Sequence, residues 1–284
     1  SVFDISQSPM ALLPLLLVLV LAPAAFATPT NHTYPITATV EIFWSFLFLP
    51  RADVEAFLGM GPATPDLSLA PEDEIVRAFN SSEVRAGYYP LVLQFEKNID
   101  FGPLVGDKVL YLTFHALHVV VPFVRHVQLG HPFTFRKLGI LDNLIILAGS
   151  QMQFDYDNLF SHIEMTDSSY KMTRPRVFKS SVVSEAKFTT TKPWGTAADY
   201  PELLSEMPIL QQPWFAAAAA KKCGAFKIDI HNSVFKVRPV DSWTWQADAD
   251  FPLTILQGDH YFGSAVQARC SFAETEAVPC DSFF

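Results

Sequence analysis

Two acidic residues in the middle of the chain, Asp155 and Asp157, have a spacing that could support acid–base chemistry. Residues two positions apart on a β-strand point to the same face, so both carboxyl groups would share one side of a strand. If that side lined a closed interior, repulsion between the carboxylates would raise the pKa of one of them and let it donate a proton. The other interpretation, an exposed strand face or turn, stays open because carboxylates are seldom fully buried.

A group of histidines, His115, His118, His126 and His131, raises the question of a metal site. Residues three apart on a strand point to opposite faces, so His115 and His118 cannot converge on one ion there. We therefore predict no metal site. The sequence also has no phosphate-binding glycine loop, no Gly-x-Ser-x-Gly elbow, no HExxH motif and no zinc-type cysteine pairs, and we expect no cofactor.

A binding site for a small anion is a further hypothesis. Arg125, Arg136 and Lys137 could pair with an anionic ligand, although surface salt bridges would explain them equally well. We select Arg125, together with Tyr156 between the two aspartates, as candidate ligand-binding residues. A nucleic-acid partner is disfavoured, because the net charge is −9 and no Lys/Arg cluster is present.

The N-terminus indicates entry into the secretory route. An unbroken apolar run follows Met10 and ends in Ala25-Phe26-Ala27, the small-x-small form that signal peptidase accepts. We predict a leader and cleavable signal over residues 1–27, followed by a single β-rich domain over 28–284 in a secreted or lumenal protein. An uncleaved segment would instead tie the protein to a membrane. Within the domain, Asn31 and Asn80 begin glycosylation sequons.

Three cysteines occur in the chain. Cys270 and Cys280 are near in sequence, and we predict that a disulfide between them fixes the C-terminal segment in an oxidising compartment. Cys223 would then remain as a buried free thiol.

Hydrophobic patterns predict a mainly β fold: a barrel or sandwich of many antiparallel strands, decorated by two or three short helices. The clearest strands are expected at Ile36–Leu49, Tyr88–Lys97 and Lys108–Val124, and further strands from Gln151 onward. Helices are expected at Arg51–Met60, Asp142–Ala148 and Asp199–Gln212, the second capped by Asp142 or Asn143 and ended by Gly149.

Taken in order, these elements resemble the acetoacetate decarboxylase-like family. The segments that carry the likeness, spread over residues 36–275, read YPLVLQFEK, VVVPFV, LDNLIILAG and PELLSEMPIL. The resemblance implies a β-barrel whose interior pocket takes a keto acid, and a lysine that forms a Schiff base shortly after the Asp-initiated helix. It also places His115 near a pocket acid of the family, which makes His115 a candidate catalytic residue with Asp155 and Asp157.

The lysine that the resemblance implies is missing. The corresponding stretch, Met152–Asn158, reads MQFDYDN. We therefore predict a protein that binds or transforms a small, mostly apolar or keto-acid molecule without a Schiff-base lysine. An active decarboxylase-type lyase that uses Asp and His acid–base groups is one alternative, and a non-catalytic structural or interaction protein is another. Catalysis and the oligomeric state are left open.

Overall fold

A computed structural model describes most of the chain after Tyr34. The described residues are 36–60, 66–79, 84–103, 112–127, 132–154, 158–174, 181–201, 203, 214–215, 222–228, 234–248, 251, 254–257, 260–275 and 277–283. All of them belong to one unit, Tyr34–Phe284. The predicted signal segment, Asn31 and Asn80 lie outside the described residues.

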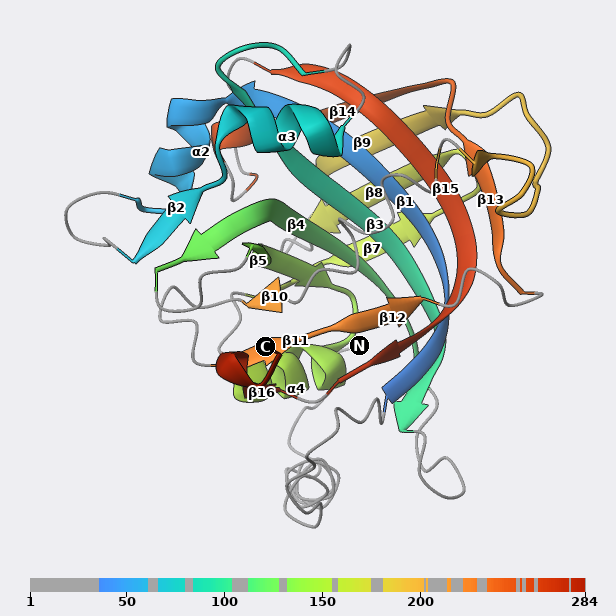
Figure 1. Cartoon of the computed structure of the whole chain (residues 1–284). Helices are drawn as coiled ribbons and strands as arrows, with labels where there is room; N and C mark the ends of the chain where they lie inside the picture. The colour runs from blue at the N-terminus through green and yellow to red at the C-terminus, as the bar shows by residue number, and fades with distance from the viewer. Residues whose placement is uncertain are drawn as a thin grey trace. The chain divides into compact units, whose positions relative to one another are not determined.

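Most of the described strands form one twelve-stranded sheet that curls strongly (Figure 1). Its order is β12-β15-β1-β3-β4-β5-β10-β11-β16, with β13 beside β15, β2 beside β4 and β6 beside β5. Pairing is antiparallel except where β5 meets β6 and β10. The bounds are β1 Ile36–Pro50, β2 Leu67–Leu69, β3 Tyr88–Pro103, β4 Leu112–His126, β5 Pro132–Leu141, β6 Asn158–Phe160, β10 Trp214–Phe215, β11 Lys222–Gly224, β12 Phe226–Ile228, β13 Lys236–Pro239, β15 Tyr261–Glu274 and β16 Val278–Pro279.

A second sheet covers one face of the first, and the main hydrophobic core lies between the two sheets. Its order is β14-β9-β8-β7, with bounds Ser242–Ala247, Ser181–Thr189, Ser169–Arg174 and His162–Met165. Aromatic rings join the two sheets: Phe43 stacks on Phe188 with ring centroids 3.8 Å apart, and Phe95 contacts Tyr170 at 4.7 Å. Offset aromatic pairs of this kind add to the free energy of burial.

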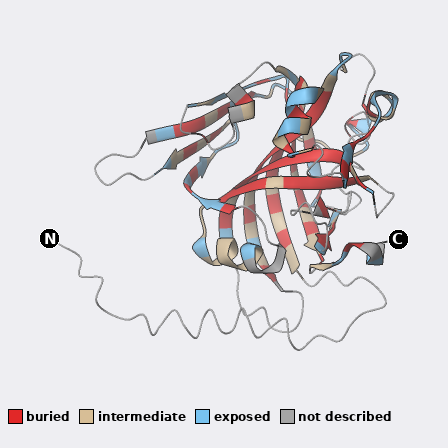
Figure 2. Ribbon diagram, turned by 90° about the vertical axis from the view of Figure 1, so that its left-hand side faces the viewer, coloured by how far each residue is buried: buried red, intermediate tan, exposed pale blue. Residues whose placement is uncertain are grey.

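Strand β1 shows why the sequence folds in this way. Its β-branched and aromatic residues favour an extended backbone. Every residue from Phe43 to Leu49 is buried, because this part of the strand is covered on both faces (Figure 2). Pro50 ends the strand and a short helix follows at Arg51, as the sequence predicts. Pro50 is the N-cap of this helix, α2, Arg51–Phe57.

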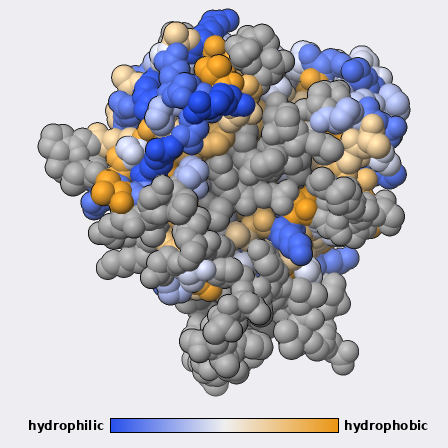
Figure 3. Space-filling model, viewed as in Figure 1, coloured by the Kyte–Doolittle hydropathy of each residue, from blue (hydrophilic) through white to orange (hydrophobic). Residues whose placement is uncertain are grey.

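Helix α3, Glu72–Ala78, was not predicted from the sequence. It is short and polar, so its hydrophobic period is weak. Three acidic residues lie in its first turn and Arg77 in its last, and both placements suit the helix dipole. Hydrophilic side chains accordingly gather over α2 and α3 on the face shown in Figure 3.

Helix α4, Leu144–Phe154, begins where the sequence predicts and ends later. Asn143 Oδ1 accepts hydrogen bonds from the backbone N–H groups of Ile145 at 2.9 Å and Ile146 at 3.2 Å, which confirms the predicted cap. The predicted end at Gly149 and the predicted strand from Gln151 are wrong. Glycine inside a helix costs only about 1 kcal/mol, and the helix continues through it.

The predicted fold class is confirmed, because the described chain is mostly strand, with a half-barrel sheet and three α-helices. Two short 3-10 helices, η3 at Thr254–Gln257 and η4 at Cys280–Phe283, complete the described elements. None of the helices within the described ranges has both the length and the apolar character needed to span a membrane.

Phe188→Ala should destabilise the fold by about 3–5 kcal/mol, because it removes the ring that stacks on Phe43 and leaves a cavity between the sheets. Urea unfolding of the purified protein measures this change. Val182→Ala on the same strand is the matched control: Val182 is 44% exposed, and its loss should cost no more than about 0.5 kcal/mol. Equal effects of the two variants would contradict the assigned core.

Candidate functional site

The large sheet curls until strands from its two ends meet. β12 lies at one end of the strand order and β10 near the other, yet Trp214 of β10 stacks against Phe226 of β12 with ring centroids 6.3 Å apart. The face of the sheet turned away from the second sheet therefore encloses an interior. This interior is the candidate functional site.

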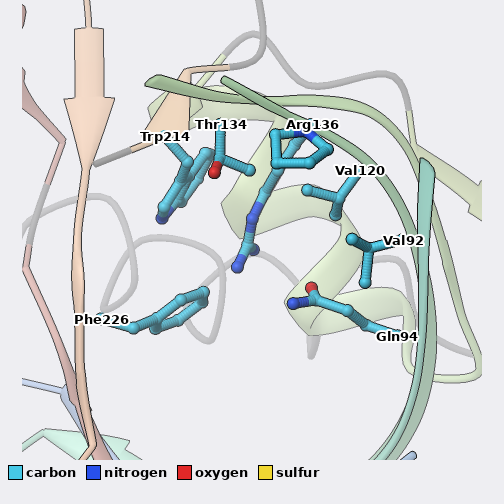
Figure 4. A pocket seen from close by; sticks show the side chains of 8 residues that line it. Val92, Gln94, Val120, Thr134, Arg136, Trp214 and Phe226 are labelled. Carbon is cyan, nitrogen blue, oxygen red and sulfur yellow. The ribbon is translucent and has the colours of Figure 1, made fainter. Parts of the chain in front are cut away.

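Two small adjoining cavities lie in this interior. One, of about 10 Å³, is lined by Val92, Gln94, Val120, Pro122, Thr134, Arg136, Trp214 and Phe226 (Figure 4). The other, of about 30 Å³, is lined by Val40, Ile42, Trp44, Gln94, Glu96, Phe226, Ile228 and Phe272. Gln94 and Phe226 belong to both walls, so the cavities are neighbours. On this measure the first cavity has room for about one water molecule and the second for about two.

Arg136 places a positive charge in this interior. Its side chain points from β5 into the first cavity (Figure 4), and the residue is only 4% exposed. The guanidinium carbon lies 4.2 Å from the ring centroids of both Trp214 and Phe226. Within the described part of the chain no hydrogen bond or ion pair of this guanidinium is found, and its Nε is buried without a partner. The aromatic rings are its main compensation.

Irregular strand pairing surrounds Arg136. The register between β4 and β5 shifts between Val119 and Val120, and again between Val121 and Val124. Phe123, inside the second irregularity, has φ of +56°, a conformation that is strained for a bulky side chain. Such bulges turn side chains away from their regular direction and recur beside functional sites.

Burial raises the pKa of two acidic neighbours of Arg136. Desolvation raises the pKa of Glu96, while Arg136 and a hydrogen bond from Asn98 Nδ2 lower it. Desolvation likewise raises the pKa of Glu274 to about 7, and Glu96 raises it further, against the opposing effect of Arg136. Glu274 is therefore about half ionised near pH 7.

His118 adds no second positive charge to this interior. Desolvation and the nearby Arg136 both hold the pKa of His118 well below its usual range, so the ring is neutral near pH 7. Its Nε2 lies 3.7 Å from Glu96 Oε2, which is too long for a hydrogen bond. The interior thus combines the permanent positive charge of Arg136 with a neutral histidine and with carboxyl groups whose pKa is raised. Such a site can accept a small anion and exclude water from it.

Comparisons with known proteins show the same fold. The chain is similar to an acetoacetate decarboxylase from Legionella pneumophila, with a TM-score of 0.55, 11% identity, and coverage of 89% of this chain and 92% of that one. It is also similar to the enduracididine biosynthesis enzyme MppR complexed with pyruvate, at 0.53 and 12%, covering 92% and 93%. The fold is acetoacetate decarboxylase-like.

A third similar structure is an acetoacetate decarboxylase-like enzyme from Sphingomonas wittichii RW1, with a TM-score of 0.50, 11% identity, and coverage of 90% of this chain and 98% of that one. No family model matches the sequence. No curated protein matches it either. The likeness to the decarboxylase-like proteins is therefore one of fold.

The acetoacetate decarboxylase-like fold places His115 outside the two cavities. His115 pairs with Lys97 on the face of β4 opposite His118, as predicted for residues three apart. Its Nδ1 lies 2.7 Å from Asp142 Oδ2, and its backbone N–H donates to Asp142 Oδ1 at 2.7 Å. This pair joins the start of β4 to the end of β5. The catalytic role of His115 stays a prediction.

Of the remaining predicted site residues, Arg125 is described and lines neither cavity. Arg125 forms an ion pair with Glu74 of α3, at the other end of β4 from His115. Asp155, Tyr156 and Asp157 lie outside the described residues. Among the described side chains, His, Cys, Asp and Glu form no group of three or more that could hold a metal ion.

The predicted disulfide is wrong. Cys280 bonds to Cys223, and Cys270 is the buried free thiol. The reason is topological: β11, which contains Cys223, pairs with β16 immediately before Cys280, whereas Cys270 lies inside β15 opposite Val40. Short sequence separation favoured Cys270, but strand pairing decides which sulfurs meet.

Sequence reasoning named Arg136 as one of three cations that could pair with an anion, but selected Arg125. It did not select Glu96, His118 or Glu274. The available signal was the YPLVLQFEK segment, in which Gln94 and Glu96 alternate with apolar residues and so share one face. The sequence alone does not show that this face lines a closed interior.

Glu274→Gln tests the electrostatics of the interior. The folded-state pKa of Glu274 is about 7, above about 4.3 for an unfolded chain, so the folded protein binds the extra proton between these values. This carboxyl group therefore lowers stability as pH rises from about 4.3 to 7. Relative to wild type, the variant should gain about 1–3 kcal/mol between pH 4.5 and pH 8, measured by urea unfolding at both values.

The matched control for this titration is Glu164→Gln, because Glu164 is 61% exposed on the second sheet. Its stability difference from wild type should change little between the two pH values. A Glu274→Gln variant that behaves in the same way would show that Glu274 ionises normally in the folded protein.

Proposed function

We propose that this protein binds a small carboxylate in the interior of its acetoacetate decarboxylase-like half-barrel, with the carboxylate on Arg136. The observation that carries the proposal is a buried guanidinium that lines a cavity and has no ion-pair partner among the described residues. A buried charge without a counter-ion costs several kcal/mol, so a protein gains stability when an anion reaches it.

The chemistry of the cavity walls indicates what kind of carboxylate fits. Trp214 and Phe226 flank the guanidinium, and Trp44, Ile42 and Phe272 line the adjoining cavity. A short molecule with an anionic head and an apolar or neutral remainder matches these walls. The solved structure of MppR with pyruvate shows that a protein of similar fold holds a molecule of this class.

Schiff-base chemistry is not part of the proposal. Neither cavity lined by described residues includes a lysine. The stretch Met152–Asn158, where the resemblance places the catalytic lysine, also contains none. The proposed activity is therefore binding, or a reaction that needs no imine.

A decarboxylase-type lyase remains the second candidate, and the observation that favours it is Glu96. Glu96 lines the second cavity, and desolvation raises the pKa of its carboxyl group, which favours a role as proton donor beside the site of the proposed anion. Glu96→Gln would keep the hydrogen-bonding shape of the side chain and remove this acid. Release of carbon dioxide from acetoacetate by wild type and not by the variant would support this candidate.

Export is also part of the proposal. The apolar run that ends at Ala27 supports it, and so does the disulfide between Cys223 and Cys280, because such bonds persist in oxidising compartments. N-terminal sequencing of the protein secreted by a eukaryotic host should give Thr28 as the first residue. A protein that stays in the cytosol with the run intact would contradict export.

Arg136→Met is the decisive variant. The wild-type protein should show a saturable rise in melting temperature with pyruvate, equivalent to about 2.7 kcal/mol at one hundred times Kd, and no rise with the uncharged methyl ester. The variant should lose this response. It should also be as stable as wild type without ligand, or more stable, because methionine removes an uncompensated buried charge.

Lys137→Met is the control for Arg136→Met. Lys137 is the next residue of β5, and its ammonium lies over the ring of Phe57 of α2. This variant should keep the full response to pyruvate. An Arg136→Met protein that unfolds while Lys137→Met does not would assign Arg136 to structure, and an unchanged response in Arg136→Met would exclude it from binding.

A further inference from the structure

The wall over Arg136 is built from very short strands. β10 joins the rest of the sheet through two residue pairs with β5, Trp214 with Thr134 and Phe215 with Phe135. β11 in turn pairs with β10 at two positions, and β16 pairs with β11 at two. Among the described residues, these pairings place β10, β11 and β16 side by side over the interior.

Trp214 is the part of the wall that touches the site. Its indole lies over the guanidinium of Arg136, lines the first cavity and stacks against Phe226. Removing this ring from its place would expose the cation to water. The affinity of the interior for an anion should then fall, because water weakens the electrostatic attraction.

Strand β11 holds this indole in place. A Cβ atom at Gly224 would lie 2.8 Å from Trp214 Cε2, so the glycine backbone packs directly against the ring. The backbone N–H of the next residue, Ala225, donates to Thr275 Oγ1, and the backbone N–H of Thr275, just after β15, donates to the carbonyl oxygen of Ala225. Glycine is thus required here because the backbone passes so near the ring.

The disulfide joins this strand to the last described turn of the chain. Cys223 precedes Gly224, and its partner Cys280 begins η4 after β16. Both cysteines are buried, at 0% and 2% exposure. The covalent bond therefore fixes β11 and with it the face that contacts Trp214.

We propose that the Cys223–Cys280 disulfide is a clasp that keeps Trp214 over Arg136 and thereby couples anion binding to the redox state of the protein. This inference rests on the proposed function, because it assigns a regulation to the same interior. A disulfide that serves only as a general staple would stabilise the whole fold through the entropy of the unfolded chain. A clasp acts locally, on the wall.

The redox step needs an external dithiol as the two-electron reductant. One of its thiolates attacks a protein sulfur, forms a mixed disulfide and releases the other cysteine as a thiolate, which takes up a proton. The second thiol of the reductant then closes its own disulfide and releases the second cysteine. Because both sulfurs are buried, attack requires the wall to open, and an anion that favours the closed wall should slow the reduction.

Hydrogen exchange in the absence of ligand tests the clasp by itself. In a Cys223→Ala, Cys280→Ala variant, amides of β10, β11 and β12 should exchange about tenfold faster than in wild type, while β8 and β9 of the second sheet are unchanged. Cys270→Ala, which removes the buried free thiol, is the matched control and should leave both regions unchanged. An equal rise in both sheets, or no rise, would overturn the clasp.

Gly224→Ala provides a second variant that keeps the disulfide. The added methyl group must displace the indole of Trp214, so pyruvate binding should weaken about tenfold with the disulfide still formed. Unchanged pyruvate binding in this variant would show that the position of Trp214 does not control the site.

The final experiment uses pyruvate as the probe and dithiothreitol as the reductant. Saturating pyruvate should slow reduction of the disulfide in wild type and have no effect in Arg136→Met. Absence of pyruvate binding to oxidised wild type would overturn the proposed function. Pyruvate binding with an unchanged reduction rate would overturn the clasp alone.

Discussion

The contact between the guanidinium of Arg136 and the rings of Trp214 and Phe226 joins strands from opposite ends of the large sheet. An open sheet has no interior, so the curl that brings β10 and β12 together creates the candidate site. The same contact places a permanent positive charge inside the protein. Desolvation raises the pKa of both Glu96 and Glu274 beside this charge.

The structure separates the fold of the acetoacetate decarboxylase-like proteins from their imine chemistry. The likeness extends over about nine-tenths of the chain, yet identity to the similar structures is 11–12%. A fold positions groups around an interior, and the residues at those positions decide the reaction. Here an arginine between aromatic rings is the feature of the interior that can act on an anion, which favours recognition of a carboxylate over attack on a keto group.

The C-terminal part of the chain contributes more to the site than its short strands suggest. A disulfide and a close glycine–indole contact join β10, β11 and β16 to each other and to the interior.

The sequence by itself determined the mainly β class, the first strand and helix, and the Asn143 cap, since these depend on local propensity and period. It also showed that Met152–Asn158 contains no lysine. Tertiary structure alone decided that Cys280 meets Cys223, that His115 pairs with Asp142 away from the cavities, and that Arg136, and not Arg125, faces the interior. The physical reason is that strand register and bulges determine which face of a strand becomes an interior, and both depend on partners far away in the sequence.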